Sequence, residues 1–140
     1  MINITKETSV SIDDVLHLYQ AVGWTNYTNQ PQMLEQSLTH SLAIYVARDG
    51  EEIVGLVRLV GDGFSSVFVQ DLIVLPSYQR QGIGSNLMKE ALADYKDAYQ
   101  IQLATEQTEK NLGFYRSLGF ETLSTYDCTG MIWVDRKKFK

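Results

Sequence analysis

The sequence is short of cysteine and of long apolar runs, and both shortages narrow what the chain can be. Cys128 is the only cysteine, so no internal disulfide can form, and a reducing compartment fits this composition. No segment approaches the ~18 consecutive apolar residues of a membrane span. Residues 1–10 alternate polar and apolar side chains, which is not the pattern of a signal peptide. We therefore expect a cytoplasmic protein that does not associate with membranes.

Basic residues and histidine are also scarce. The chain has 12 Lys and Arg against 17 Asp and Glu, which gives a formal net charge of -5. This balance argues against a nucleic-acid partner, because such proteins present a basic face. It fits a cationic substrate, or simply a solvated acidic surface. The two histidines, His17 and His40, lack the spacing of metal ligands, so no metal site is expected.

What is present is typical of one globular domain. The chain has 140 residues, of which 44% are apolar and 21% are charged, which is enough to bury a single core. No repeat, linker or low-complexity stretch interrupts it. We therefore predict a single domain over residues 1–140.

The first third of the chain predicts a short strand and two helices. Ile2 to Thr5 alternates as a strand would, and Ser11, with Asp14 in the capping-box position, begins a helix that ends near Gly23. Pro31 fits the first turn of a second helix. Between the two lies a loop with Trp24 and Tyr27. These aromatic side chains either pack internally or wall a substrate pocket.

The remainder predicts a mixed sheet. Strands are expected over residues 42–48, 52–60 and 67–75, separated by Asp49-Gly50 and Gly61-Asp62-Gly63 turns. A helix from Ile83 to about Tyr95 follows, then a strand over residues 100–104 and a helix capped by Thr108 and closed by Gly119. Residues 120–126 and 131–135 predict a terminal hairpin, and residues 136–140 a solvated end. This order is that of an α+β fold.

One segment, Gln79-Arg80-Gln81-Gly82-Ile83-Gly84-Ser85, joins a strand to the start of a helix. Amides in the first turn of a helix lack internal partners, and the helix dipole adds partial positive charge there. Glycines allow a ligand oxygen to approach the backbone closely. These are the properties of a phosphate cradle. The dinucleotide motif is a poor match, because Leu87 stands where its third glycine belongs. A P-loop is excluded, because Ser85 and Asn86 follow Gly84 instead of Lys and Ser or Thr.

The remaining match is to the acyl-CoA signature of the GNAT superfamily of N-acyltransferases, which Gln79-Arg80-Gln81-Gly82-Ile83-Gly84 closely resembles. Leu72 to Tyr78 resembles the family's lead-in strand and its proline-containing turn. Phe114 to Phe120 resembles the family's second segment, where a helix ends. The resemblance implies a mostly antiparallel sheet flanked by helices, with a splayed parallel strand pair at the CoA site.

The resemblance also implies a donor, acetyl-CoA, and the residues that bind it. Amides of the turn would hold the pyrophosphate, Gln79 and Arg80 would flank it, and the backbone of the lead-in strand would bond the pantetheine arm. The implied CoA-binding residues are Leu72, Ile73, Val74, Gln79, Arg80, Gln81, Gly82, Ile83, Gly84 and Ser85. Thr108 and Asn111 replace the family's asparagine and alanine, so their contacts to the arm are open.

The implied reaction is direct transfer of the acetyl group to a primary amine. Tyr115 matches the family's tyrosine near the sulfur and would protonate the leaving thiolate. Asp71 is favoured over Glu106 as the base for the amine, although Asp71 could instead pair with Arg58. The acceptor is a small amine or a protein lysine or N-terminus. Alternatively, the chain is a non-catalytic acyl-CoA sensor, and a homodimer is also possible by analogy.

Overall fold

The structure is a computed structural model that describes residues 1–133 and 135. Its contacts divide the chain into two compact units, residues Met1–Thr105 and residues Glu106–Lys140. The first unit contains the sheet and most helices, and the second contains one α-helix, a short 3-10 helix and the segment that follows them. We describe each unit separately. In the part of the chain that the structure describes, no helix is both long and apolar enough to cross a bilayer.

The first unit is built on one five-stranded sheet, in which the strands lie side by side in chain order. The strands are β1 (Ile2–Glu7), β2 (Ala43–Asp49), β3 (Glu52–Gly61), β4 (Ser66–Val74) and β5 (Gln100–Leu103). The first three pairings are antiparallel, and β4 with β5 is parallel. Gly50, at a φ of 62°, closes the first predicted hairpin. The mixed, mostly antiparallel sheet is therefore confirmed.

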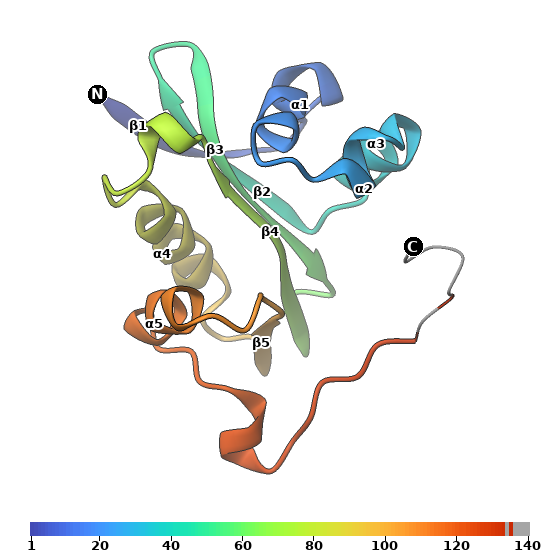
Figure 1. Cartoon of the computed structure of the whole chain (residues 1–140), viewed down its shortest axis with the longest axis vertical. Helices are drawn as coiled ribbons and strands as arrows, with labels where there is room; N and C mark the ends of the chain where they lie inside the picture. Colours follow the sequence, from blue (N-terminus) through green and yellow to red (C-terminus); the bar gives the residue numbers. More distant parts are fainter. Residues whose placement is uncertain (134, 136–140) are drawn as a thin grey trace. The chain divides into compact units, whose positions relative to one another are not determined.

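Helices cover both faces of this sheet (Figure 1). On one face lie α1 (Ile12–Ala21), α2 (Thr25–Thr28) and α3 (Pro31–Thr39), and on the other lies α4 (Ile83–Tyr95). Both central strands, β2 and β3, are buried along most of their length, because each is covered from two sides. The predicted loop between α1 and α3 contains the short helix α2, which periodicity over four residues could not indicate.

The core lies between the sheet and the first three helices. Its fully buried side chains come from α1, α3 and the central strands, and they include Val15, Leu18, Leu34, Val46 and Leu56. On the opposite face, Ile83, Leu87, Met88 and Ala91 of α4 are buried against the sheet. The helical spacing of these four residues is the one that predicted α4 from the sequence. The N-terminus of α4 is thereby fixed beside the end of β4.

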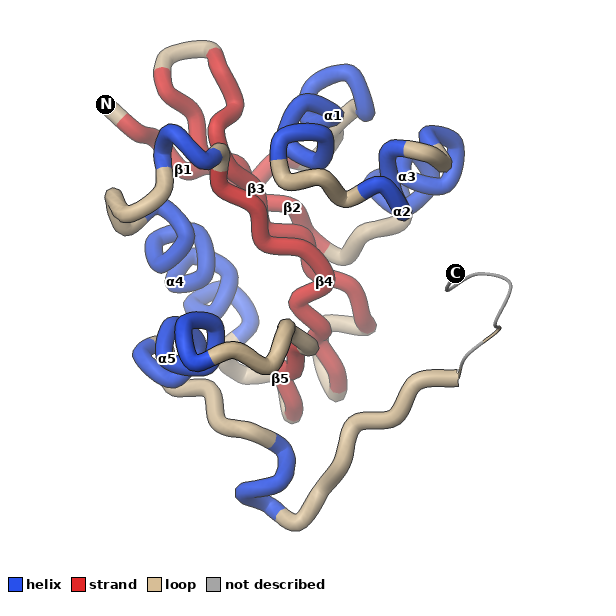
Figure 2. Tube along the Cα trace, in the orientation of Figure 1, coloured by secondary structure: helices blue, strands red, loops and turns tan. Residues whose placement is uncertain are grey.

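The second unit contains α5 (Glu109–Ser117) and the 3-10 helix η2 (Leu123–Tyr126), shown in Figure 2. Thr108 caps α5, because its hydroxyl accepts the Asn111 N–H at 3.1 Å, and Gly119 closes it at a φ of 97°. The predicted terminal hairpin is wrong over the described residues. Leu123–Tyr126 is a turn of helix, and residues 127–133 form no strand. Val134 and the predicted solvated end, residues 136–140, lie outside the described residues.

Candidate active site

The glycine segment forms a tight turn between β4 and α4. Gly82 adopts the left-handed conformation, with a φ of 79° and a ψ of 8°, and Arg80 also has a positive φ, 64°. The side-chain amide of Gln79 donates to the carbonyl oxygen of Val74 at 3.1 Å, which ties the turn to the end of β4. Arg80 and Gln81 are exposed. The strand, glycine turn and helix start predicted from the sequence therefore follow one another as expected.

The turn leaves the first amides of α4 open to a ligand. The helix begins with the Asn86 N–H donating to the carbonyl of Gly82 at 3.0 Å. The amides of Ile83, Gly84 and Ser85 precede this bond, so they have no acceptor within the helix. No side chain caps α4. A row of uncapped amides at the positive end of a helix dipole favours an anion such as a pyrophosphate.

The strand that leads into the turn has an open edge. β4 pairs with β5 only from Ser66 to Val69, whereas it pairs with β3 as far as Val74. Among the described residues, no strand pairs with the other edge of Leu72, Ile73 and Val74. Where two parallel strands part in this way, the unpaired backbone groups of one strand can hydrogen-bond the amide groups of a ligand. The ligand then takes the place of an added strand. This is the splayed pair that the sequence analysis expected.

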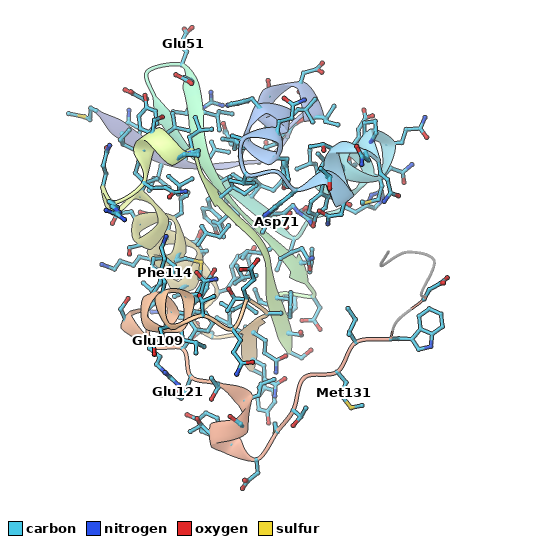
Figure 3. All side chains as sticks on the ribbon, in the orientation of Figure 1. Glu51, Asp71, Glu109, Phe114, Glu121 and Met131 are labelled. Atoms are coloured by element: carbon cyan, nitrogen blue, oxygen red, sulfur yellow. The ribbon has the colours of Figure 1, made fainter. Side chains whose placement is uncertain are left out.

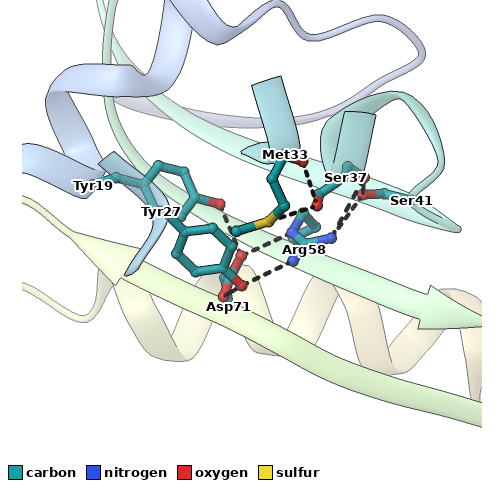
Figure 4. A network of polar contacts seen from close by, with 7 residues as sticks. All are labelled: Tyr19, Tyr27, Met33, Ser37, Ser41, Arg58 and Asp71. Carbon is teal, nitrogen blue, oxygen red and sulfur yellow. Dashed lines mark hydrogen bonds and ion pairs between the residues drawn. The ribbon is translucent and has the colours of Figure 1, made fainter. Parts of the chain in front are cut away.

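Asp71, the favoured candidate base, lies at the centre of a buried polar network (Figure 4). Its side chain is 2% exposed and is paired with Arg58, whose Nε donates to Oδ2 at 2.8 Å. The hydroxyl of Tyr19 donates to Oδ2 and that of Tyr27 to Oδ1, each at 2.9 Å. Both oxygens of the Asp71 carboxylate are therefore already bonded to donors inside the protein.

The same network joins four elements of the first unit, namely α1, α2, β3 and β4. Arg58 of β3 also donates to the hydroxyls of Tyr27 and Ser41, at 3.1 and 3.3 Å. Burial, reinforced by the neighbouring Asp71, raises the pKa values of Tyr19 and Tyr27. Burial alone would lower the pKa of Arg58, but its pairing with Asp71 outweighs that effect and raises it. At neutral pH the two phenols of the network are therefore neutral and Arg58 is a cation.

The two predicted substrate-binding residues, Trp24 and Tyr27, belong to an aromatic cluster that shares Tyr19 and Tyr27 with this network. Tyr27 is buried, and its ring lies 5.0 Å from that of Tyr19 in an edge-on arrangement. Trp24 is half-buried, with its ring 6.1 Å from Tyr19 and 6.3 Å from Tyr27. Tyr27 therefore packs inside the protein, which is the first of the two interpretations given for these aromatic residues. Trp24 is only partly buried, so it is the better candidate for a substrate contact.

The other candidate residues belong to the second unit. Tyr115 lies on α5, and its ring packs edge-on against those of Phe114, at 5.0 Å, and Phe120, at 5.9 Å. Burial raises its pKa, so the phenol stays neutral and able to donate a proton. The hydroxyl oxygen of Thr108 accepts the bond that caps α5, and its hydroxyl hydrogen can still be donated to a ligand. Glu106, the alternative base, is exposed.

Two contributors to the network were not singled out as site residues from the sequence. Tyr19 lies within the first predicted helix, and the sequence indicates Arg58 only as an alternative partner for Asp71. A signal existed for Arg58, since a charged residue inside an apolar strand needs a buried counter-charge. Among residues 1–133 and 135, no group of three His, Cys, Asp or Glu side chains is arranged to hold a metal ion.

Comparison with known proteins identifies the family. The sequence model described as the acetyltransferase (GNAT) domain matches residues 40–122, more than half of the chain. This chain belongs to the GNAT family of acetyltransferases. Within the matched region lie β2, β3, the lead-in strand β4, the glycine turn and α5. The resemblance drawn from the two sequence segments is therefore confirmed.

Individual GNAT relatives support this assignment over most of the chain. A GNAT-family acetyltransferase protein of Streptococcus pneumoniae TIGR4 is 74% identical, with a TM-score of 0.90 over 97% of this chain and 99% of that one. Rice (Oryza sativa subsp. japonica) serotonin N-acetyltransferase 2, chloroplastic, is 27% identical over 117 residues, 81% of this chain. The match covers 58% of the rice protein, so this chain spans about three fifths of that relative.

A further GNAT structure shares the fold at lower identity. The GNAT acetyltransferase of Elizabethkingia anophelis, solved with acetyl-CoA bound, is 23% identical and superposes with a TM-score of 0.63. The similarity covers 86% of this chain and 76% of that one. At this identity the likeness shows the fold alone.

Proposed function

We propose that this GNAT protein is an N-acetyltransferase that transfers the acetyl group of acetyl-CoA to a primary amine. The observation that carries the proposal is the uncapped start of α4 next to the open edge of β4. The first fits a pyrophosphate and the second fits the amides of a pantetheine arm. Both belong to the same strand, turn and helix of the first unit.

The chain's own residues supply most of the binding. Amides of Gln81 to Ser85 would bond the pyrophosphate oxygens, and the exposed guanidinium of Arg80 would add a charge-assisted contact. Backbone groups of Leu72, Ile73 and Val74 would bond the pantetheine amides. Gln79 holds the turn against Val74 and so positions the amides rather than contacting the donor. Thr108 and Asn111 are proposed as additional contacts to the arm.

The reaction needs four events at the thioester. A neutral amine attacks the carbonyl carbon, and a backbone amide of β4 stabilises the negative charge that develops on the oxygen. The carbon–sulfur bond then breaks, and CoA leaves as a thiolate that takes a proton from the Tyr115 phenol. The new amide gives up its extra proton. Tyr115 is suited to its step because its raised pKa keeps it protonated.

We choose between the two candidate bases, Asp71 and Glu106, by how deeply each carboxylate is buried. Asp71 is 2% exposed and accepts hydrogen bonds from Arg58, Tyr19 and Tyr27. We therefore propose that its role is structural and that it fixes α1 and α2 against β4. Glu106, by contrast, is exposed. We therefore propose that the amine loses its proton to Glu106 or to solvent.

The acceptor is proposed to be a cationic amine. The net charge of -5 attracts such molecules, and the exposed part of Trp24 provides an aromatic surface for an ammonium or a ring. The rice relative is named for serotonin, an amine with an aromatic ring. This name agrees with an aromatic contact to the acceptor.

Release of free thiol from acetyl-CoA tests the proposal. The panel contains polyamines, arylalkylamines, aminoglycosides and lysine peptides, each titrated to saturation. We expect saturable, amine-dependent thiol release with at least one class, and a Tyr115→Phe variant that still binds CoA but turns over slowly. No release with any amine, together with tight CoA binding by calorimetry, would instead identify a non-catalytic acyl-CoA sensor.

A further inference from the structure

The turn between β4 and α4 contains backbone that needs support from its surroundings. Arg80 has a φ of 64°, in the left-handed region that a residue with a Cβ rarely adopts, and Gly82 follows with a φ of 79°. Residues 79–82 are all exposed, so the turn receives little support from packing. Backbone that is strained in this way persists only where the neighbouring structure fixes it. The conformation of the turn therefore depends on the contacts made at its two ends.

Tyr78 makes such a contact immediately before the strained residues. It is the last residue of the 3-10 helix η1 (Pro76–Tyr78), and its hydroxyl donates to Oδ2 of Asp49 at 2.7 Å. The bond to Asp49 raises the pKa of Tyr78, so the phenol stays protonated and able to donate. The other side-chain bond described for residues 75–82 is that of Gln79 to Val74, within the strand that enters the turn. Tyr78 therefore ties the turn to a different strand.

The partner of Tyr78 belongs to a part of the sheet that is itself firmly held. Asp49 is the last residue of β2 and pairs with Ile2 of β1 on one side and with Glu52 of β3 on the other. It lies where β2 enters the hairpin turn that leads to β3, and Figure 3 labels Glu51 at the tip of that hairpin. A hydrogen bond to this position therefore connects the turn to a fixed point of the sheet.

We propose that Tyr78 is a positioning residue for donor binding and acts through its bond to Asp49. The bond holds the start of the turn, so that the left-handed residues after it keep the first amides of α4 directed at the pyrophosphate. A site that already has its bound conformation loses less conformational freedom when the ligand binds, and this raises affinity. In this role Tyr78 needs no contact with the donor itself. The inference rests on the proposed function, because it concerns the pyrophosphate of CoA.

Binding of CoA, measured by calorimetry, and of a pantetheine fragment, measured by amide NMR, tests this role. Tyr78→Phe removes only the hydroxyl, and we expect it to weaken CoA binding on the order of tenfold, as for a hydrogen bond to a charged group. Pantetheine binding should not change, because the fragment has no pyrophosphate. In turnover assays the KM for acetyl-CoA should rise by a similar factor, with kcat at saturation unchanged. Tyr99→Phe is the control, since Tyr99 is 81% exposed and its loss of a hydroxyl should change neither affinity.

Variants of Asp49 test whether Tyr78 acts through this carboxylate. Asp49→Asn keeps an oxygen that can accept the bond and should retain most of the wild-type affinity for CoA. The double variant Tyr78→Phe/Asp49→Ala should bind CoA no more weakly than Asp49→Ala alone, because both changes remove the same bond.

The outcomes separate this inference from the proposed function. A wild-type chain that does not bind CoA would overturn both. CoA binding that Tyr78→Phe leaves unchanged would overturn the role of Tyr78 alone. Equal losses of affinity for CoA and pantetheine would also overturn it, because they would show a general disturbance of the fold. Additive losses in the double variant would exclude action through Asp49.

Discussion

At the scale of single residues, the best-defined feature is the ion pair between Asp71 and Arg58. The two side chains face each other across β3 and β4, at 2.8 Å, and both are at most 5% exposed. Charges buried this deeply contribute only when they remain paired, because an isolated one is costly. Two tyrosines complete the bonds of the carboxylate, so α1 and α2 depend on it for their positions.

Removing the charge of Asp71 should therefore be strongly destabilising. Asp71→Asn leaves Arg58 buried without a counter-charge, and we expect it to lower the free energy of unfolding by about 3–5 kcal/mol. Urea denaturation measures this loss. Tyr27→Phe is the matched control, since it removes one hydroxyl that bonds two charged groups of the same network and should cost less, about 1.5–3 kcal/mol. A loss below that of Tyr27→Phe would contradict the assigned structural role.

The environment of Tyr115 predicts how activity depends on pH. Burial raises its pKa, so the proton-bearing form persists above the ordinary value of ~10. Turnover should accordingly rise with pH as the amine acceptor loses its proton, without a fall from Tyr115 ionisation below pH ~10.

Profiles of kcat against pH for the wild type and for Tyr115→Phe show whether a change in turnover with pH comes from ionisation of Tyr115. The variant should lose about 10²–10⁴-fold in kcat, with CoA affinity nearly unchanged. A fall in wild-type activity well below pH 10 that disappears in Tyr115→Phe would mean that the phenol ionises early, against the account.

At the scale of elements, the position of α4 depends on a glycine in the neighbouring strand. A Cβ on Gly55 of β3 would lie 3.0 Å from the carbonyl oxygen of Ile73 and 3.3 Å from Leu87 of α4. The missing side chain thus lets α4 approach the sheet closely enough for its first turn to sit beside the end of β4. A glycine inside an otherwise apolar strand can indicate such a close approach, but not which element approaches, because Leu87 of α4 lies far along the chain.

Filling this space should disturb both stability and donor binding. Gly55→Ala is expected to lower the free energy of unfolding by about 1–3 kcal/mol, since a backbone atom must give way. Gly113→Ala on α5 is the control, because a Cβ there meets nothing within 4 Å. It should raise stability by about 0.5–1 kcal/mol. Denaturation of both variants checks the pair, and equal effects would contradict the packing argument.

The sequence predicted elements wherever local patterns decide them. The hairpin turn at Gly50, the capped start of α5 at Thr108 and the uncapped start of α4 all follow from residues that are neighbours in the chain. The bonds of Tyr19 and Tyr27 to Asp71 join residues 52 and 44 positions apart, which no local pattern encodes. The terminal hairpin is wrong because Leu123–Tyr126, within its expected first strand, forms a turn of 3-10 helix instead.

At the scale of the whole molecule, the net charge of -5 predicts a salt dependence of acceptor binding. The field of an acidic protein concentrates cations, and salt screens it, with a Debye length of ~30 Å at 0.01 M and ~8 Å at 0.15 M. The KM for a polyamine should rise roughly 2–5-fold between these conditions. The control is a weakly basic aromatic primary amine, which is uncharged at neutral pH, and its KM should not change. Equal changes for both acceptors would refute electrostatic attraction.

The central claim is that acetyl-CoA binds along β4 and at the start of α4, and backbone amide NMR tests it most directly. Titrating unreactive CoA into the labelled chain should shift the amides of Leu72 to Val74 and of Gln81 to Ser85 more than others of the first unit. A pantetheine fragment without the pyrophosphate should shift only the β4 group. Saturable CoA binding that leaves the amides of Gln81 to Ser85 unmoved would contradict the account.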